Sequence, residues 1–344
     1  MLILIVVLGL LVQYRLNLWN RDFFDALERK DGPEIWQQSL IFLPLALSSI
    51  MLACSGVWGR MTAQRRWREW LSRHLIAEWL ANGRYRRLHL LPGDHENPEY
   101  RIAEDARVAT DAPVDFAVGL LTAVLTAITF IDVLWSVGGD LVVDAFGRTL
   151  VVPGYLVIAA VVYASVTTGG MLLIGRRLVL VVERKNAAEA ELRHAATRMR
   201  EKVLRGDLQE SSGLTAALWT AMGQVIMHWQ HLCTQLMRTT VISHGNSLLT
   251  PFIGLILCAP KYLSGSMTLG EVTQAAAAFV TVQAAFNWLV DNYPRLADWR
   301  SSVHRVASLL VSLDTLDGLE RSAHSGRAPH AEAEEPELGV RNGG

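Results

Sequence analysis

The sequence predicts an all-α membrane protein, from its composition, the length of its apolar segments and the uneven placement of its basic residues. Of the 344 residues, 51% are hydrophobic and eleven are tryptophan, and the mean hydropathy is positive at +0.24. The formal net charge of −1 gives no bulk attraction to nucleic acid, so no nucleic-acid partner is expected. Lipid is therefore the first solvent to consider.

A helix that crosses the hydrocarbon core of a bilayer needs about 20 mostly apolar residues. Six candidate spans lie at about residues 1–16, 39–58, 115–135, 150–174, 240–262 and 268–290. The first is the weakest, because Met1–Val12 is too short to cross alone and lacks the features of a signal peptide. Either its helix continues beyond Tyr14 or the start of the chain is missing. The last span is Ala-rich and carries three amides, so we expect it to face protein or water more than lipid.

The distribution of Lys and Arg predicts the orientation, because basic residues stay on the cytoplasmic side in short connections. The connections Gly59–Val114 and Arg176–Thr239 carry ten basic residues each. By contrast, Arg15–Gln38 has four, and Ser136–Thr149 and Ala259–Met267 have one each. We therefore predict a multi-pass membrane protein. Both long connections and both termini lie in the cytoplasm, and three short loops lie outside.

Both long connections have helical patterns, which predicts helices that project beyond the membrane. Trp and Leu recur at helical spacing from Gln64 onward, and Glu183–Leu204 is rich in Ala, Leu, Glu and Arg. Asn97-Pro98 is expected to break the first projection near its tip, and Gly206 the second. Each tip is a candidate docking surface.

The domain organisation follows from these patterns. Residues 1–313 are predicted to form one transmembrane domain with long helical extensions. Residues 314–344 are predicted to be a disordered C-terminal tail, since periodicity ends and Gly, Pro, Ala, Glu and Ser take over.

Motifs for catalysis, metals or nucleotides are not evident in the sequence. The segment nearest to a phosphate-binding loop, Gly170–Gly175, lies in an apolar span and is followed by two arginines instead of a lysine and a hydroxyl residue. His228 and His231 could chelate a metal or titrate, but no further ligand stands at a suitable spacing, and polar side chains at a membrane boundary are the simpler interpretation. We therefore expect no catalytic residue, metal or cofactor on this chain.

Polar residues within the spans are costly in lipid and often mark a pathway. Gln283 and Asn287 share one helix face and Gln274 lies on the opposite face, so the three are candidates for lining a cavity or for interhelical hydrogen bonds. Asp132 and Glu271 are acidic residues near the spans and are candidates for proton coupling. For Asp132, a snorkelling side chain at the membrane boundary is the alternative.

Three motifs in this order resemble those of a known family. They are Asn17-Leu18-Trp19-Asn20-Arg21-Asp22-Phe23-Phe24-Asp25-Ala26-Leu27, Asn97-Pro98-Glu99-Tyr100-Arg101-Ile102-Ala103-Glu104-Asp105 and Tyr293-Pro294-Arg295-Leu296-Ala297-Asp298-Trp299-Arg300. They resemble SbmA/BacA-like bacterial transporters and, more closely, the membrane half of bacterial ABC transporters related to the peroxisomal fatty-acyl exporters. The resemblance covers about Gln13 to Leu313.

The resemblance implies a six-helix exporter-type fold that works as a homodimer or with a related half-transporter. It further implies intracellular helix tips that dock on ATPase domains, and cargo such as antimicrobial peptides, cobalamin-like molecules or fatty-acyl compounds. Arg101, Glu104 and Asp105 are the candidates for force transmission, with a solvated charged helix end as the alternative. The second long connection departs from the family, because about five residues of a coupling segment are absent between Glu201 and Gly206.

Three functions remain open from the sequence. The first is a permease subunit that moves a peptide or lipid-like solute by alternating access, energised by a separate ATPase subunit. The second is a proton-driven peptide importer without a motor. The third is a non-transporting scaffold or the remnant of a truncated transporter.

Overall fold

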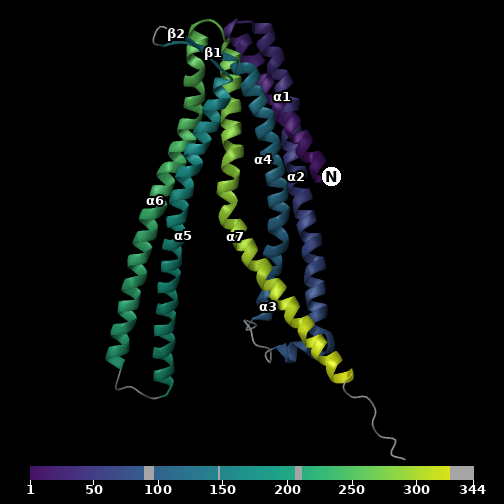
Figure 1. Cartoon of the computed structure of the whole chain (residues 1–344), viewed down its shortest axis with the longest axis vertical. Helices are drawn as coiled ribbons and strands as arrows, with labels where there is room; N and C mark the ends of the chain where they lie inside the picture. The colour runs from purple at the N-terminus through teal and green to yellow at the C-terminus, as the bar shows by residue number, and fades with distance from the viewer. Residues whose placement is uncertain (89–96, 146–147, 206–210, 326–344) are drawn as a thin grey trace, which may run out of the picture. The chain divides into compact units, whose positions relative to one another are not determined.

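The computed structural model describes residues 1–88, 97–145, 148–205 and 211–325, and this part of the chain is dominated by long helices (Figure 1). The long helices are α1 (Leu2–Glu28), α2 (Gly32–Leu80), α4 (Ala106–Gly138), α5 (Tyr155–Leu204), α6 (Ser211–Leu263) and α7 (Leu269–Ser325). The short elements are a 3-10 helix (η1, Ala81–Arg86), α3 (Pro98–Tyr100), a π-helical turn (η3, Arg101–Asp105) and the strands β1 (Asp140–Ala145) and β2 (Arg148–Pro153). The predicted all-α fold class is confirmed.

Two compact units divide the chain. Unit 1 comprises Met1–Arg60 and Phe116–Tyr293, and unit 2 comprises Met61–Asp115 and Pro294–Gly344. Helices α2, α4 and α7 each contribute residues to both units.

Five helical segments in the described residues are long and apolar enough to cross a membrane, namely Leu2–Glu28, Gly32–Arg86, Pro98–Gly138, Tyr155–Leu204 and Gly213–Leu263. Helix α7 is not among them. Its first part instead lies in the core of unit 1, where Ala275, Ala278 and Phe279 are almost completely buried. The expectation that the Ala-rich span faces protein is thereby confirmed, and small residues explain how neighbouring helices approach it closely.

The core of unit 1 gathers residues from four other helices around this part of α7. Phe130 and Leu134 of α4, Leu156 and Ala160 of α5, and Cys258 of α6 are buried in it, and residues of α1 pack against it. In unit 1, small residues on one helix leave space for large side chains of a neighbouring helix. A Cβ atom added at Gly119 of α4, for example, would collide with the indole of Trp288.

A β-hairpin corrects the predicted start of the fourth span. Residues from Leu150 were expected to be helical, but Arg148–Pro153 forms strand β2, which pairs antiparallel with β1 in a register that places Val142 opposite Val151. Runs rich in β-branched residues favour strand over helix. Gly154, with φ of +58°, then turns the chain into α5.

The three short connections of unit 1 lie at the same end of that unit. The first is tighter than expected, since α1 runs on to Glu28 and α2 starts at Gly32, so most of Arg15–Gln38 is helical. Glu28 accepts hydrogen bonds from the backbone N–H of Leu269 (2.9 Å) and from the Tyr262 hydroxyl (3.2 Å). Lys261 donates to the Gly138 carbonyl (2.6 Å). This shared end agrees with the prediction that the three loops face one side of the membrane.

Unit 2 is a small helical bundle with its own core. Leu75 of α2 and Ile102 of η3 pack against Leu309, Leu313 and other residues of α7. The predicted tail therefore begins too early: α7 continues to Ser325, and Leu316 is buried because it extends the apolar stripe that contains Leu309 and Leu313. Residues 326–344 of the predicted tail lie outside the described residues.

The two predicted projections are helical as expected, but one break is misplaced. Helix α2 ends before Asn82 and Gly83, both of which have left-handed backbone angles. Asn97-Pro98 instead begins a helix, with Pro98 in the first helical position, where its missing N–H costs nothing. Helix α5 extends to Leu204, and the predicted break at Gly206 lies outside the described residues.

Candidate functional site

The Arg101–Asp105 cluster, which we define as Arg101, Asp105, Ser302 and Arg305, is a charged group in unit 2 that joins η3 to α7. Asp105 is 2% exposed and Arg101 is 5% exposed, although both are charged. Arg305 of α7 forms two hydrogen bonds with the Asp105 carboxylate, from Nε to Oδ2 (2.8 Å) and from Nη2 to Oδ1 (2.6 Å). Arg101 donates to the Arg305 carbonyl (3.4 Å). A bidentate pair of this kind fixes the relative position of two chain segments.

The environment of Asp105 keeps its carboxylate charged. Burial is the largest single influence and raises the pKa, because it disfavours the charged form. Hydrogen bonds from Arg305 and Ser302, with the charges of Arg305 and Arg101, together outweigh burial and lower the pKa of Asp105 below its ordinary value. The ion pair therefore persists at neutral pH.

Glu104, the third candidate for force transmission, is separated from this cluster. Its half-exposed carboxylate pairs with Arg107 one turn along the chain, at 3.1 Å from Nε, and the hydrogen bond from Arg107 lowers its pKa. The structure therefore brings Arg101 and Asp105 together in a buried site, whereas Glu104 belongs to an exposed pair on the helix surface.

The three amides of α7 occupy different environments in unit 1. Gln283 is 2% exposed and donates to the Ala160 carbonyl of α5 (2.7 Å), which is an interhelical hydrogen bond. Gln274 is 1% exposed, and its backbone carbonyl accepts a hydrogen bond from Asn17 of α1 (3.2 Å). Asn287 is half-buried. Gln274 and Gln283 therefore have different neighbours, and the side-chain contact of Gln283 favours helix packing over cavity lining.

The two candidates for proton coupling lie on different helices. Asp132 has an exposed position on α4. Glu271 is in the first turn of α7, where its carboxylate accepts from the Thr268 backbone N–H (3.0 Å) and its own N–H donates to the Thr268 hydroxyl (3.2 Å). This reciprocal pair is a capping box, which gives Glu271 a structural role.

Each of the three sequence motifs forms hydrogen bonds that involve α7, a result that the sequence alone did not reveal. In the first motif, Asp25 accepts from the Gly270 backbone N–H at the start of α7 (2.8 Å). The second motif contributes the Arg101–Asp105 cluster. In the third motif, which lies on α7 itself, Arg295 binds Asp115 (3.0 Å) and Trp299 donates to the Ala109 carbonyl of α4 (3.3 Å). Helix α7 is therefore the element on which the motifs converge.

Arg305 and Asp25 are the residues that sequence reasoning missed. Arg305 lies just beyond the third motif and has no distinguishing local pattern. A weak sequence feature could have pointed to Asp25, because it is an acidic residue in a motif that precedes an apolar span. Their partners lie 200 and 245 positions away along the chain, respectively, so spacing could not reveal either contact.

Comparison with known proteins identifies the family. Residues 1–263 match the family described as ABC transporter transmembrane region 2. The chain belongs to this family. The match covers α1 to α6 and includes every helical segment that is long and apolar enough to cross a membrane in the described residues.

Individual relatives of this family member are ABC transporter proteins. Inner membrane ABC transporter ATP-binding protein YddA of Escherichia coli (strain K12) is 26% identical over 326 residues, covering 89% of this chain and 55% of that protein. ABC transporter D family member 2, chloroplastic, of Arabidopsis thaliana is 21% identical over 305 residues, covering 87% of this chain and 40% of that protein. The chain thus spans about half the length of the curated relatives it matches.

Proposed function

We propose that this chain is the permease half of an ABC transporter and moves an amphipathic solute across the bacterial inner membrane by alternating access. Peptides, cobalamin-like molecules and fatty-acyl compounds are the candidate solutes. The observation that carries the proposal is the match of residues 1–263 to a family of ABC transporter transmembrane regions.

An ATP-binding domain outside these 344 residues would supply the energy. Two relatives whose names describe ATP-binding proteins extend well beyond the region they share with this chain. We further propose that the permease works as a pair, with a second copy or with a related half-transporter.

Helix α7 is the element that would carry force from such a domain. The Arg101–Asp105 cluster joins the end of the first long connection to α7 through a bidentate ion pair with a buried carboxylate, which resists sliding of one segment past the other. Movement of η3 would therefore be passed to α7, which runs without interruption from Leu269 to Ser325.

Transport measurements on inside-out membrane vesicles test this function. The full chain would be produced with a candidate ATP-binding partner, and uptake of a labelled proline-rich peptide, cobalamin and a fatty-acyl compound would be measured with and without ATP. We expect ATP-dependent movement of one solute class. Arg305→Ala should abolish the ATP dependence, whereas Arg107→Ala, which breaks the exposed pair, should preserve it.

Two results would contradict the proposal. Uptake that a protonophore abolishes and ATP does not affect would favour the proton-driven importer. In that case, Asp132→Asn and Glu271→Gln should change the pH dependence of uptake. Correct membrane insertion with no movement of any solute would favour a non-transporting scaffold.

A further inference from the structure

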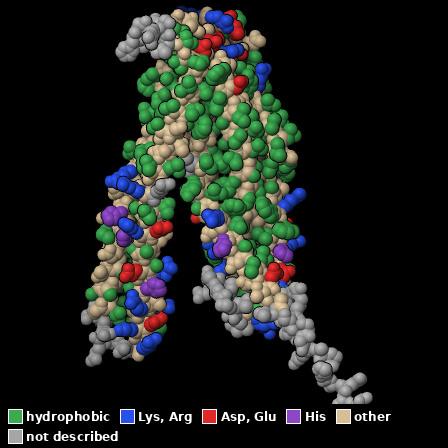
Figure 2. All heavy atoms as spheres, in the orientation of Figure 1, with side chains coloured by type: hydrophobic (Ala, Val, Ile, Leu, Met, Phe, Trp, Pro, Cys, Tyr) green, Lys and Arg blue, Asp and Glu red, His purple; other side chains and the backbone are tan. Residues whose placement is uncertain are grey.

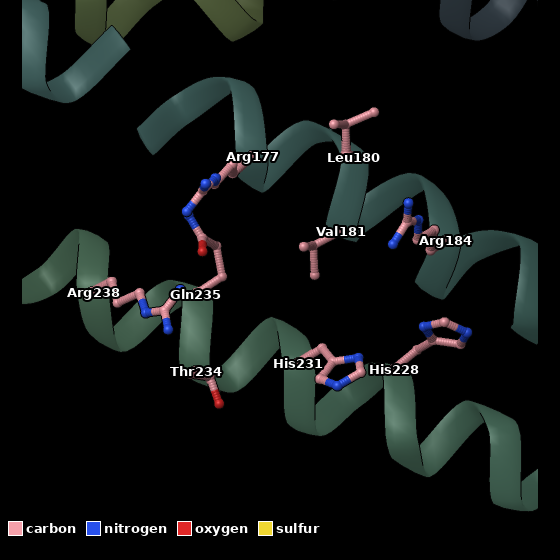
Figure 3. A pocket seen from close by; sticks show the side chains of 9 residues that line it. All are labelled: Arg177, Leu180, Val181, Arg184, His228, His231, Thr234, Gln235 and Arg238. Carbon is pink, nitrogen blue, oxygen red and sulfur yellow. The ribbon is translucent and has the colours of Figure 1, made fainter. Parts of the chain in front are cut away.

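A hollow of about 340 Å³ lies between α5 and α6, and the proposed transport mechanism does not use it (Figure 3). Its lining carries three arginines and two histidines: Arg177 and Arg184 of α5, and His228, His231 and Arg238 of α6. No Asp or Glu is among its described lining residues. The hollow begins where both helices leave their predicted spans, at residues 174 and 240.

Two cross-helix contacts hold the hollow open at its ends. At the end near the spans, the buried Gln235 of α6 donates to the Ile174 carbonyl of α5 (3.2 Å). At the other end, the indole of Trp229 donates to Glu189 (3.2 Å), and the Lys185 ammonium lies 4.9 Å from the centre of the Trp229 ring. The helix spacing between these contacts is therefore set by hydrogen bonds from both ends.

The arginines of the hollow form an uncompensated positive site. The ion pairs found in the described residues do not include Arg177, Arg184 or Arg238. In Figure 3, Arg177 and Val181 point from α5 toward α6, and Arg184 lies one turn further along α5. Guanidinium groups bind phosphate oxygens through paired hydrogen bonds. A phosphate would therefore neutralise the charge of these arginines and accept hydrogen bonds from them.

Exposed apolar side chains border the arginines of the hollow, which distinguishes a lipid from a soluble anion. Beside the arginines of α5, Val179 and Leu180 are more than half exposed, and so are Met237 and Val241 beside Arg238 of α6. Figure 2 shows hydrophobic side chains giving way to basic and histidine side chains along this helix pair. Phosphate-binding groups bordered by exposed apolar side chains fit a molecule with a charged head and acyl chains.

We propose that the hollow binds the headgroup of an anionic phospholipid, whose acyl chains lie along the apolar faces of α5 and α6. With the proposed orientation, the lipid belongs to the cytoplasmic leaflet. Its phosphate offsets the repulsion among the three arginines and holds the two helices together next to the membrane surface.

Native mass spectrometry of the full chain, released from nanodiscs with equal amounts of phosphatidylglycerol and phosphatidylcholine, tests the site. The wild type should retain phosphatidylglycerol with a preference of about tenfold or more, as expected for several arginines near one phosphate. The triple variant Arg177→Gln, Arg184→Gln, Arg238→Gln should lose that preference. The matched control Arg193→Gln, Arg198→Gln, Arg200→Gln removes the same charge from exposed positions of α5 and should keep it.

A second variant separates the site from general charge and from misfolding. Val181→Trp fills the hollow without changing any charge and should also abolish the preference, with unchanged elution and circular dichroism. An unchanged preference in the triple variant or in Val181→Trp would overturn the proposal, as would an equal loss in the control. Displacement of phosphatidylglycerol by millimolar inorganic phosphate would assign the site to a soluble anion and overturn it too. None of these measurements involves transport, so their failure leaves the proposed permease function standing.

Discussion

At the scale of single residues, Asp105 shows how a charge can be buried and remain charged. Its carboxylate is 2% exposed and has a bidentate partner in Arg305, whose own side chain is 38% exposed. A solvated helix end, the alternative drawn from the sequence, does not describe Asp105, and force transmission by this residue stays a prediction. The residue instead ties η3 to α7, and this contact can be tested in two ways.

Removing the partner of Asp105 should destabilise the protein. Arg305→Ala is expected to lower the free energy of unfolding by about 2 kcal/mol, because it leaves a buried carboxylate unpaired. Arg305 is partly exposed, so the loss should be smaller than the roughly 3–5 kcal/mol expected for a fully buried pair. Thermal unfolding followed by tryptophan fluorescence in detergent would measure it. Arg107→Ala, which breaks an exposed pair nearby, should cost less than about 1 kcal/mol. An equal loss in both variants would contradict the structural role of the cluster.

Because of this ion pair, the free energy of unfolding should also depend on pH in the acidic range. Because the pKa of Asp105 is lower in the folded protein than in the unfolded chain, the folded state binds fewer protons, and its advantage is complete above about pH 4. This stabilisation is lost as the pH falls through the pKa that Asp105 has in the folded protein. The unfolding midpoint of the wild type should therefore approach that of Asp105→Asn as the pH is lowered from about 5 through the ordinary Asp value of about 3.9 and on to more acidic pH. A constant difference across that range would exclude this linkage.

At the scale of elements, α7 is organised by its neighbours more than by its own sequence. Its start is capped by Thr268 with Glu271 and by Asp25 and Glu28 of α1, which satisfy backbone N–H groups that a helix leaves without partners. A Cβ atom added at Gly270 would collide with the Arg21 carbonyl and the Asp25 carboxylate. Close approach of α1, and not backbone conformation, requires glycine at this position.

Gly270→Ala should therefore separate α1 from the start of α7. The expected destabilisation is about 1–3 kcal/mol, the usual range for overpacking, since a backbone carbonyl and a capping carboxylate must both move. Gly9→Ala in α1, where the added methyl group meets open space, should be neutral or slightly stabilising. Unfolding midpoints of the purified variants would compare them, and a destabilisation no larger than that of Gly9→Ala would show that the two helices are not in close contact.

At the scale of the whole molecule, membrane orientation is the property with the widest consequences. Unit 1 places the three short connections at one end, as the contacts of Glu28 and Lys261 demonstrate. Only the distribution of basic residues favours that end as the outer one. Both the proposed docking of an ATP-binding domain and the proposed lipid leaflet depend on this choice.

Cysteine labelling in intact spheroplasts would test the orientation. In a background with Cys54, Cys233 and Cys258 replaced by serine, a membrane-impermeant maleimide should label Ser264→Cys from outside. Glu191→Cys should be labelled only after permeabilisation, because α5 carries it past the cytoplasmic end of its predicted span. Both positions are on helical or turn surfaces accessible to solvent in the described structure. The reverse pattern would invert the topology.

The sequence by itself determined the fold class, because burial in lipid demands long apolar segments whatever the tertiary arrangement. Five of its six predicted spans lie on helices that are long and apolar enough to cross a membrane in the described residues. It also predicted the helical projections, through periodicity within each segment. The sequence-based predictions were wrong at three places. Leu150 pairs in a hairpin, Asn97-Pro98 begins a helix, and core packing extends α7 beyond residue 314. Only the tertiary structure decided that all three motifs bond to α7 and that Asp105 pairs with Arg305, because those partners are distant in sequence and their meeting depends on how the helices pack.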